Sequence, residues 1–137
     1  MPSISLPKPL SDMMATYMQG NLGDENGYII ITGGCDDPLG NQRDPAVSMN
    51  LFFCTSVTSS TFKFDPFQST ITEMAQAPHA RYRHAAAVAN GKLFVFGGRD
   101  VTDSLVHSID VRHLRCMGNS SCFDCYNTRL CLSFTIS

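Results

Sequence analysis

The fold of this chain is decided by Gly91-Lys92-Leu93-Phe94-Val95-Phe96-Gly97-Gly98, a glycine followed by five mostly apolar residues and a glycine pair. The same arrangement occurs earlier as Gly27-Tyr28-Ile29-Ile30-Ile31-Thr32-Gly33-Gly34. β-Branched and aromatic residues favour strands, and paired glycines let the backbone turn where a side chain would clash. Two copies in matching context indicate an internal repeat of strand-and-turn units. Because both strands are apolar throughout, we expect them to be buried on both faces.

The residues around the second copy predict an antiparallel meander. Asn90-Gly91 between two apolar runs is a strong hairpin signal, because both residues tolerate a positive φ. Asp65-Pro66 separates two short segments in which apolar and polar residues alternate, which indicates a second hairpin. The expected strands are, in chain order, 13–18, 28–32, 61–64, 70–74, 82–89, 93–96 and 105–111. The first four would make one sheet, and the last three a second sheet that lacks its outer strand.

The order of motifs from residue 62 to residue 111 resembles the kelch repeat. It runs through Phe62-Lys63-Phe64-Asp65-Pro66, the short segment 70–74, Pro78-His79-Ala80-Arg81, a small-residue run to Asn90-Gly91, and the diglycine strand. Kelch units usually carry Trp on the short strand, where this chain has Met74, whose flexible thioether can fill an aromatic-sized gap. The resemblance implies an all-β fold, an incomplete kelch-type β-propeller of roughly two four-stranded antiparallel blades, the second without its outer strand.

The chain divides into four parts on this interpretation. They are an N-terminal segment 1–12, a first blade 13–75 with an inserted loop 35–59, a second, partial blade 76–111, and an irregular cysteine-rich tail 112–137. The opening glycines of the two strands lie 64 residues apart (91 − 27), against about 50 for a kelch unit, and the surplus falls in the loop. Propellers close with about 4–8 blades. We therefore expect a piece of a longer propeller, which remaining blades or self-association would complete.

Composition and motifs favour an interaction module over an enzyme. A net charge of −2 with scattered basic residues gives no footprint for nucleic acid, and no stretch approaches the length of a membrane span. We find no zinc-protease, nucleophile-elbow or phosphate-loop motif, so we expect no catalytic residue, no metal and no cofactor. The resemblance implies a non-catalytic module that binds a protein or peptide. The alternative is a fragment of a kelch-type oxidase or sugar-processing enzyme whose active site lies outside this chain.

The sequence does not decide the cellular compartment of the protein. The first ten residues lack the continuous apolar segment of a signal peptide. The expectation is cytoplasmic by default, and extracellular if a longer parent protein carries a signal upstream.

Candidate binding residues fall in the inserted loop and in the link between the blades. They are Asp36, Asp37, Arg43, Arg81 and Arg83. The resemblance implies that these two connections lie on the same face of the propeller, where loops on a rigid scaffold gather binding residues. The alternatives are a merely tolerated insertion and, for Arg81, a structural role in bonding backbone carbonyls, which we favour. We interpret Gly33, Gly34, Asp65, Pro66, Gly97 and Gly98 as structural motif positions, and His84 as a packing residue.

The six cysteines form two groups. Cys35 and Cys54 bracket the inserted loop, so they are either a disulfide that closes it in an oxidising compartment or two buried free thiols. For the C-terminal group, a zinc site, two disulfides and a tail outside the folded part all remain open. Its members are Cys116, Cys122, Cys125 and Cys131. The acidic stretch 36–44 does not match the known calcium-binding loop.

Overall fold

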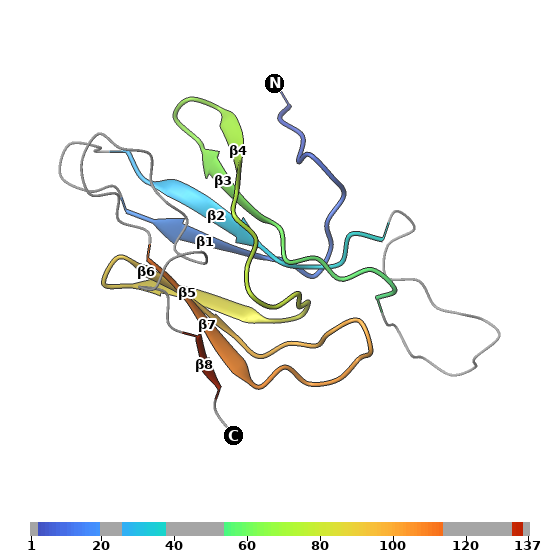
Figure 1. Ribbon diagram of the computed structural model, residues 1–137. Helices are drawn as coiled ribbons and strands as arrows, with labels where there is room; N and C mark the ends of the chain where they lie inside the picture. Colours follow the sequence, from blue (N-terminus) through green and yellow to red (C-terminus); the bar gives the residue numbers. More distant parts are fainter. Residues whose placement is uncertain (1–2, 20–25, 38–53, 114–132, 136–137) are drawn as a thin grey trace.

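The computed structural model of the chain describes residues 3–19, 26–37, 54–113 and 133–135 (Figure 1). In these ranges every regular element is a β-strand. The strands are β1 Met14–Met18, β2 Tyr28–Thr32, β3 Thr61–Asp65, β4 Thr70–Met74, β5 Ala85–Ala89, β6 Lys92–Phe96, β7 Ser108–His113 and β8 Ser133–Thr135. Among the same residues, no helix is long and apolar enough to cross a membrane.

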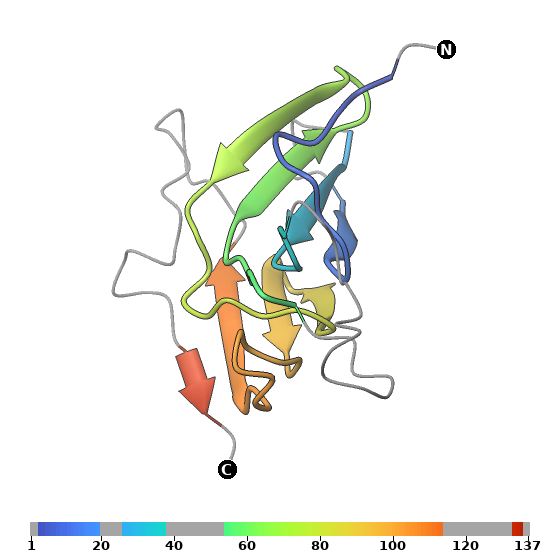
Figure 2. The same cartoon turned by 90° about the vertical axis from the view of Figure 1, so that its right-hand side faces the viewer.

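The strands pair in chain order into two antiparallel sheets, β1-β2-β3-β4 and β5-β6-β7-β8. The inner strands β1 and β5 contact each other, whereas the outer strands β4 and β8 lie at opposite ends of the molecule in two perpendicular views (Figures 1 and 2). The sheets therefore diverge like neighbouring blades of a propeller. The predicted all-β class is confirmed, and the two antiparallel sheets fit an incomplete kelch-type propeller.

Two strands, β5 and β7, differ from the prediction by more than one residue at an end. β5 begins at Ala85 and not at residue 82, because Tyr82 forms only an isolated bridge with Arg99 and Arg83 takes a positive φ of 54°. β7 begins at Ser108 and continues to His113, past the expected blade end at residue 111.

The second sheet also has a short outer strand that the sequence did not predict. Residues 133–135 pair with residues 108–110 of β7, so the tail 112–137 is not irregular throughout. Three residues beyond a long connection give no periodic signal, which is why β8 could not be foreseen.

The core lies between the two sheets. Met18 and Ile30 of the first sheet pack against Leu93 and Val95 of the second, and all four side chains are buried. Successive side chains of a strand point to opposite faces, so the other face of β6 carries Phe96, which is 38% exposed. The prediction of burial on both faces therefore holds for Ile30–Thr32 and is wrong for β6, since the first sheet covers only one of its faces.

The internal repeat extends beyond the strands. Ser11 exchanges backbone hydrogen bonds with Cys35 as Tyr82 does with Arg99, and Asp12 has a positive φ of 52°, close to the 54° of its counterpart Arg83. Counterparts are 71 residues apart at the start of each sheet (83 − 12), 64 at the glycine pairs (98 − 34) and 48 after the loop (106 − 58), where the bonds Thr58 N to Gly34 O and Val106 N to Gly98 O correspond. The inserted loop thus accounts for the surplus seen in the sequence.

The second glycine of each pair is required by a close backbone approach. Gly34 and Gly98 have φ values of +106° and +83°, where side chains are strained. A Cβ on Gly34 would lie 2.8 Å from the Ser11 carbonyl oxygen, and one on Gly98 would lie 2.7 Å from that of Tyr82. The diglycine signal therefore marks the site where the segment leading into each sheet crosses the end of its second strand.

Candidate interaction surface

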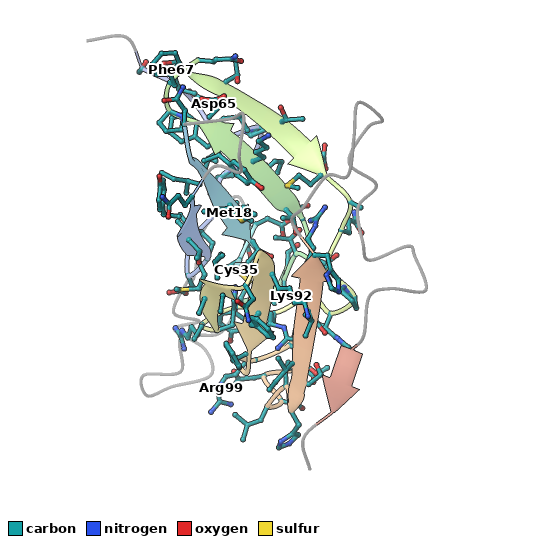
Figure 3. All side chains as sticks on the ribbon, turned by 90° about the vertical axis from the view of Figure 1, so that its left-hand side faces the viewer. Met18, Cys35, Asp65, Phe67, Lys92 and Arg99 are labelled. Carbon is teal, nitrogen blue, oxygen red and sulfur yellow. A yellow bond between two sulfur atoms is a disulfide. The ribbon has the colours of Figure 1, made fainter. Side chains whose placement is uncertain are left out.

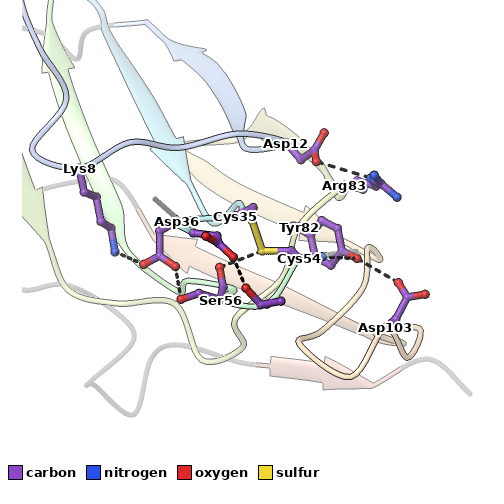
Figure 4. Close-up of a disulfide and its surroundings, with 11 residues drawn as sticks. Lys8, Asp12, Cys35, Asp36, Cys54, Ser56, Tyr82, Arg83 and Asp103 are labelled. Carbon is purple, nitrogen blue, oxygen red and sulfur yellow. Dashed lines mark hydrogen bonds and ion pairs between the residues drawn. A yellow bond between two sulfur atoms is a disulfide. The ribbon is translucent and has the colours of Figure 1, made fainter. Parts of the chain in front are cut away.

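A disulfide closes the inserted loop at its base. The structure joins Cys35, which follows the first glycine pair, to Cys54, and both residues are buried (Figure 4). Of the two interpretations of these cysteines, the disulfide is the one present. Tyr82 and Val57 pack against it, so the bond lies inside a small second core.

Tyr82 connects the loops of the two blades. Its buried hydroxyl accepts a hydrogen bond from the backbone N–H of Cys54 at 3.4 Å and donates one to the Asp103 carboxylate at 3.0 Å. Burial raises the pKa of Tyr82, and the Asp103 carboxylate acts in the same direction. The phenol therefore stays protonated and keeps its role as a donor. Because Tyr82 belongs to the link between the sheets, the base of the inserted loop and the 99–106 loop are attached to one side chain.

Asp36 fixes the start of the inserted loop. It accepts hydrogen bonds from Ser56 Oγ at 2.6 Å and from Lys8 Nζ at 3.0 Å, and Lys8 also donates to Thr58. Burial acts to raise the pKa of Asp36, but the Ser56 and Lys8 hydrogen bonds outweigh it and the pKa is lowered. Its repeat counterpart Asp100 accepts bonds from its own turn in the same way. Asp36 thus has a structural task.

Asp37 follows at the same edge of the loop. Its carboxylate accepts a hydrogen bond from the Thr55 hydroxyl, which lies on the returning side of the loop. Both sides of the loop base are therefore joined by side chains as well as by the disulfide.

Arg83 is the sequence-predicted residue most available to a partner. It stacks 5.3 Å from the centroid of the Tyr82 ring, and its Nε lies 3.6 Å from an Asp12 carboxylate oxygen. Close by, Arg99 and Asp103 form a second ion pair at 3.6 Å, and these side chains are 41% and 43% exposed. We call Asp12, Arg83, Arg99 and Asp103, around the base of the inserted loop, the loop-base surface.

Arg81 points the other way, into the space between the sheets. It is 1% exposed, and it donates to the backbone carbonyls of Gly97 at 3.0 Å and Ser108 at 2.9 Å. It also pairs with the buried Asp110 at 2.9 Å, which His79 contacts at 2.7 Å. The geometry matches the structural role favoured from the sequence and leaves Arg81 no access to a partner.

Other sequence predictions fall elsewhere. Arg43 and the C-terminal cysteine group lie outside the described residues. Across the described ranges, no cluster of three or more His, Cys, Asp or Glu could hold a metal ion. Sequence reasoning missed Asp12, Tyr82, Arg99 and Asp103. Asp12 and Arg83 occupy equivalent repeat positions with a positive φ, but the residue types around them differ, so the sequence carries no repeat signal there.

Comparison with protein families gives one match in this region. Residues 80–113, which comprise the end of the link and strands β5 to β7, match the model of the Kelch motif. No curated protein matches the chain. Strands β5 to β7 thus match a kelch motif, a kind of repeat commonly used for protein interaction.

Proposed function

We propose that this chain, with a kelch motif as its second sheet, is a non-catalytic module that binds a protein or peptide at the loop-base surface. The observation that supports the proposal is the attachment of two loops, one from each sheet, to Tyr82. The disulfide and the Lys8–Asp36 pair hold the inserted loop to the same scaffold. Binding to such a pre-ordered surface loses less conformational entropy than binding to a free loop.

The two guanidinium groups of the surface offer contacts to a partner that carries carboxylates. A guanidinium presents a planar fork that matches a carboxylate, and the Tyr82 ring holds Arg83 in place. Arg83 and Arg99 lie 3.6 Å from the carboxylates of Asp12 and Asp103, a distance longer than a close ion pair, and Arg99 also donates a hydrogen bond to the Asp103 backbone carbonyl at 2.7 Å. A carboxylate of the partner can displace either carboxylate contact, and we assign the surface to an acidic peptide segment.

The binding surface is tested by selecting peptides from a random displayed library on the purified, non-reduced chain. The affinity of a selected peptide is then measured by calorimetry for the chain and its variants. Arg83→Ala and Arg99→Ala should each weaken binding by about tenfold, which corresponds to about 1.4 kcal/mol. Lys92→Ala, which removes a cation at the β5–β6 hairpin, is the control and should bind normally. Selected peptides without acidic residues, or equal losses in all three variants, would overturn the assignment.

The proposal also states that the module is non-catalytic and that its two blades are part of a larger propeller. Two blades are fewer than the about 4–8 that close a propeller, so the module requires further blades. Transcript sequence on both sides of the chain tests whether a longer parent supplies them. Turnover of alcohols or sugars by the purified chain loaded with copper would contradict the non-catalytic interpretation.

A further inference from the structure

The same repeat positions are buried in the first sheet and open in the second. Ile30 and Thr32 of β2 are 0% and 2% exposed, because the second sheet covers them. Their counterparts, 64 residues later, are Phe94, which is half-buried, and Phe96, which is 38% exposed. The two rings stack with centroids 6.3 Å apart. The second sheet thus shows to solvent the apolar face that the first sheet uses for packing.

We call this surface the open face. The strand register places on it alternate residues of β5, β6 and β7. They are Ala85, Ala87, Ala89, Lys92, Phe94, Phe96, Ile109 and Val111. The three alanines are exposed, Lys92, Phe94 and Ile109 are half-buried, and Val111 is buried, so the open face is exposed mainly along β5 and at Phe96.

The first sheet shows the complementary half of the same interface on its far side. In the core, Ala86, Val88 and Leu93 of the second sheet pack against Met18 and Ile30. The repeat counterparts of these three residues are Ala15, Tyr17 and Ile29, and they lie on the face of the first sheet that points away from the second. We call it the linker-side face. Tyr17 is 60% exposed, Ala15 is exposed and Ile29 is half-buried, whereas Ile31, the counterpart of the core residue Val95, is already buried within the chain.

Segment 3–11, which leads into the first sheet, is the linker that belongs to the linker-side face. Segment 3–11 corresponds to the inter-sheet link 74–82, which aligns Pro7 with Pro78 and Lys8 with His79. Lys8 is held by Asp36, as His79 is held by Asp110. The first sheet therefore carries the same two parts, an apolar face and a tethered linker, that the second sheet presents at the interface between the sheets.

From this correspondence we propose that copies of this chain associate head to tail, the open face of one copy against the linker-side face of the next. Phe94 and Phe96 then occupy, toward the next copy, the positions that Ile30 and Thr32 occupy within the chain. The contact repeats an interface the molecule already contains, and such a heterologous contact closes into a ring when its rotation permits. Two to four copies would supply the about 4–8 blades of a closed propeller.

The orientation of the contact is testable with two charge variants. Phe96→Asp disables the open face, and Tyr17→Asp disables the linker-side face. Val101→Asp is the matched control, because Val101 is 54% exposed in the 99–106 loop, which carries neither face and whose first residue, Arg99, lies apart from Lys92 of the open face (Figure 3). Circular dichroism and thermal melting establish that each variant is folded before its assembly is measured.

Analytical ultracentrifugation over a concentration series gives the result. The unchanged chain and Val101→Asp should sediment as oligomers, and each face variant alone should sediment as a monomer. A mixture of the two face variants should form a one-to-one dimer, because one intact open face meets one intact linker-side face.

Three outcomes would overturn the proposal. A monomeric unchanged chain with a cooperative melt would show that another partner, such as a blade of a longer parent, covers the open face. A mixture that stays monomeric, or a loss of assembly in Phe96→Asp alone, would indicate a different contact. Since neither face includes the loop-base surface, peptide binding by the monomeric variants tests the proposed function separately.

Discussion

Lowering the pH should destabilise the protein through His84. This side chain is 7% exposed and lies against both glycine pairs, so that a Cβ on Gly33 would be 2.7 Å from its Cε1 and one on Gly98 would be 2.8 Å from its Cβ. Burial lowers the pKa of His84 to about 4; the backbone of Thr32 opposes this shift, and the charge of Arg81 adds a smaller contribution that lowers the pKa further.

The sign and size follow from proton linkage. The unfolded chain binds a proton at His84 near pH 6.5, whereas the folded chain binds it only near pH 4. The stability contributed by neutral His84 is therefore complete above about pH 6.5 and is lost as the pH falls toward 4. A shift from 6.5 to about 4 corresponds to about 3 kcal/mol, and about 2–3 kcal/mol remains after allowance for partial solvent access.

Urea unfolding of the chain and of His84→Leu, at several pH values between about 7 and 4.5, measures this contribution. The unchanged chain should lose about 2 kcal/mol more than the variant over that interval. Asp36 and Asp100 have lowered pKa values and titrate below the interval, so they do not mimic the effect. Parallel losses in the two proteins would refute the reasoning.

Three further predictions concern single contacts. Replacing Cys35 and Cys54 by Ser opens a loop with a sequence separation of 19 and should lower the free energy of unfolding by about 3 kcal/mol; a reducing agent should produce that loss in the unchanged chain and none in the variant, by urea titration. In Gly98→Ala the new Cβ meets a backbone carbonyl at 2.7 Å, whereas in Gly97→Ala it meets nothing within 4 Å. Gly97→Ala should therefore lose only the left-handed penalty of about 1–2 kcal/mol, and Gly98→Ala should lose more; equal shifts in thermal midpoint would contradict this. Arg81→Met removes one partner of a buried ion pair and should cost about 3–5 kcal/mol, and a loss under about 1 kcal/mol in denaturant melts would disprove its structural role.

Local sequence signals were sufficient for most of the strands. Asn90-Gly91 forms the expected β5–β6 turn with φ values of 51° and 66°, and Asp65 caps the β3–β4 turn by accepting the N–H groups of Phe67 and Gln68. Short turns of this kind depend on residues adjacent in the chain, so the sequence specifies them directly.

The candidate site was less accessible to prediction. Hydrogen bonds from Gly34 to Arg81 and from Cys54 to Tyr82 place the base of the loop beside the link, an arrangement that only the resemblance implied. The burial of Arg81 and the exposure of Arg83 depend on the positive φ of Arg83, which reverses the side of the chain on which its neighbours lie. The bonds of Tyr82 join residues more than 20 positions apart, and no local pattern records such contacts.

The correspondence between segments 3–11 and 74–82 locates the seam between units at the end of an outer strand. A gene duplication or deletion with its breakpoints at that seam would carry each sheet together with the linker segment that precedes it. The number of blades could then change by whole units without separating the buried Arg81 from the Asp110 carboxylate that pairs with it. Growth of such a protein by tandem copying therefore requires no repair of existing interfaces.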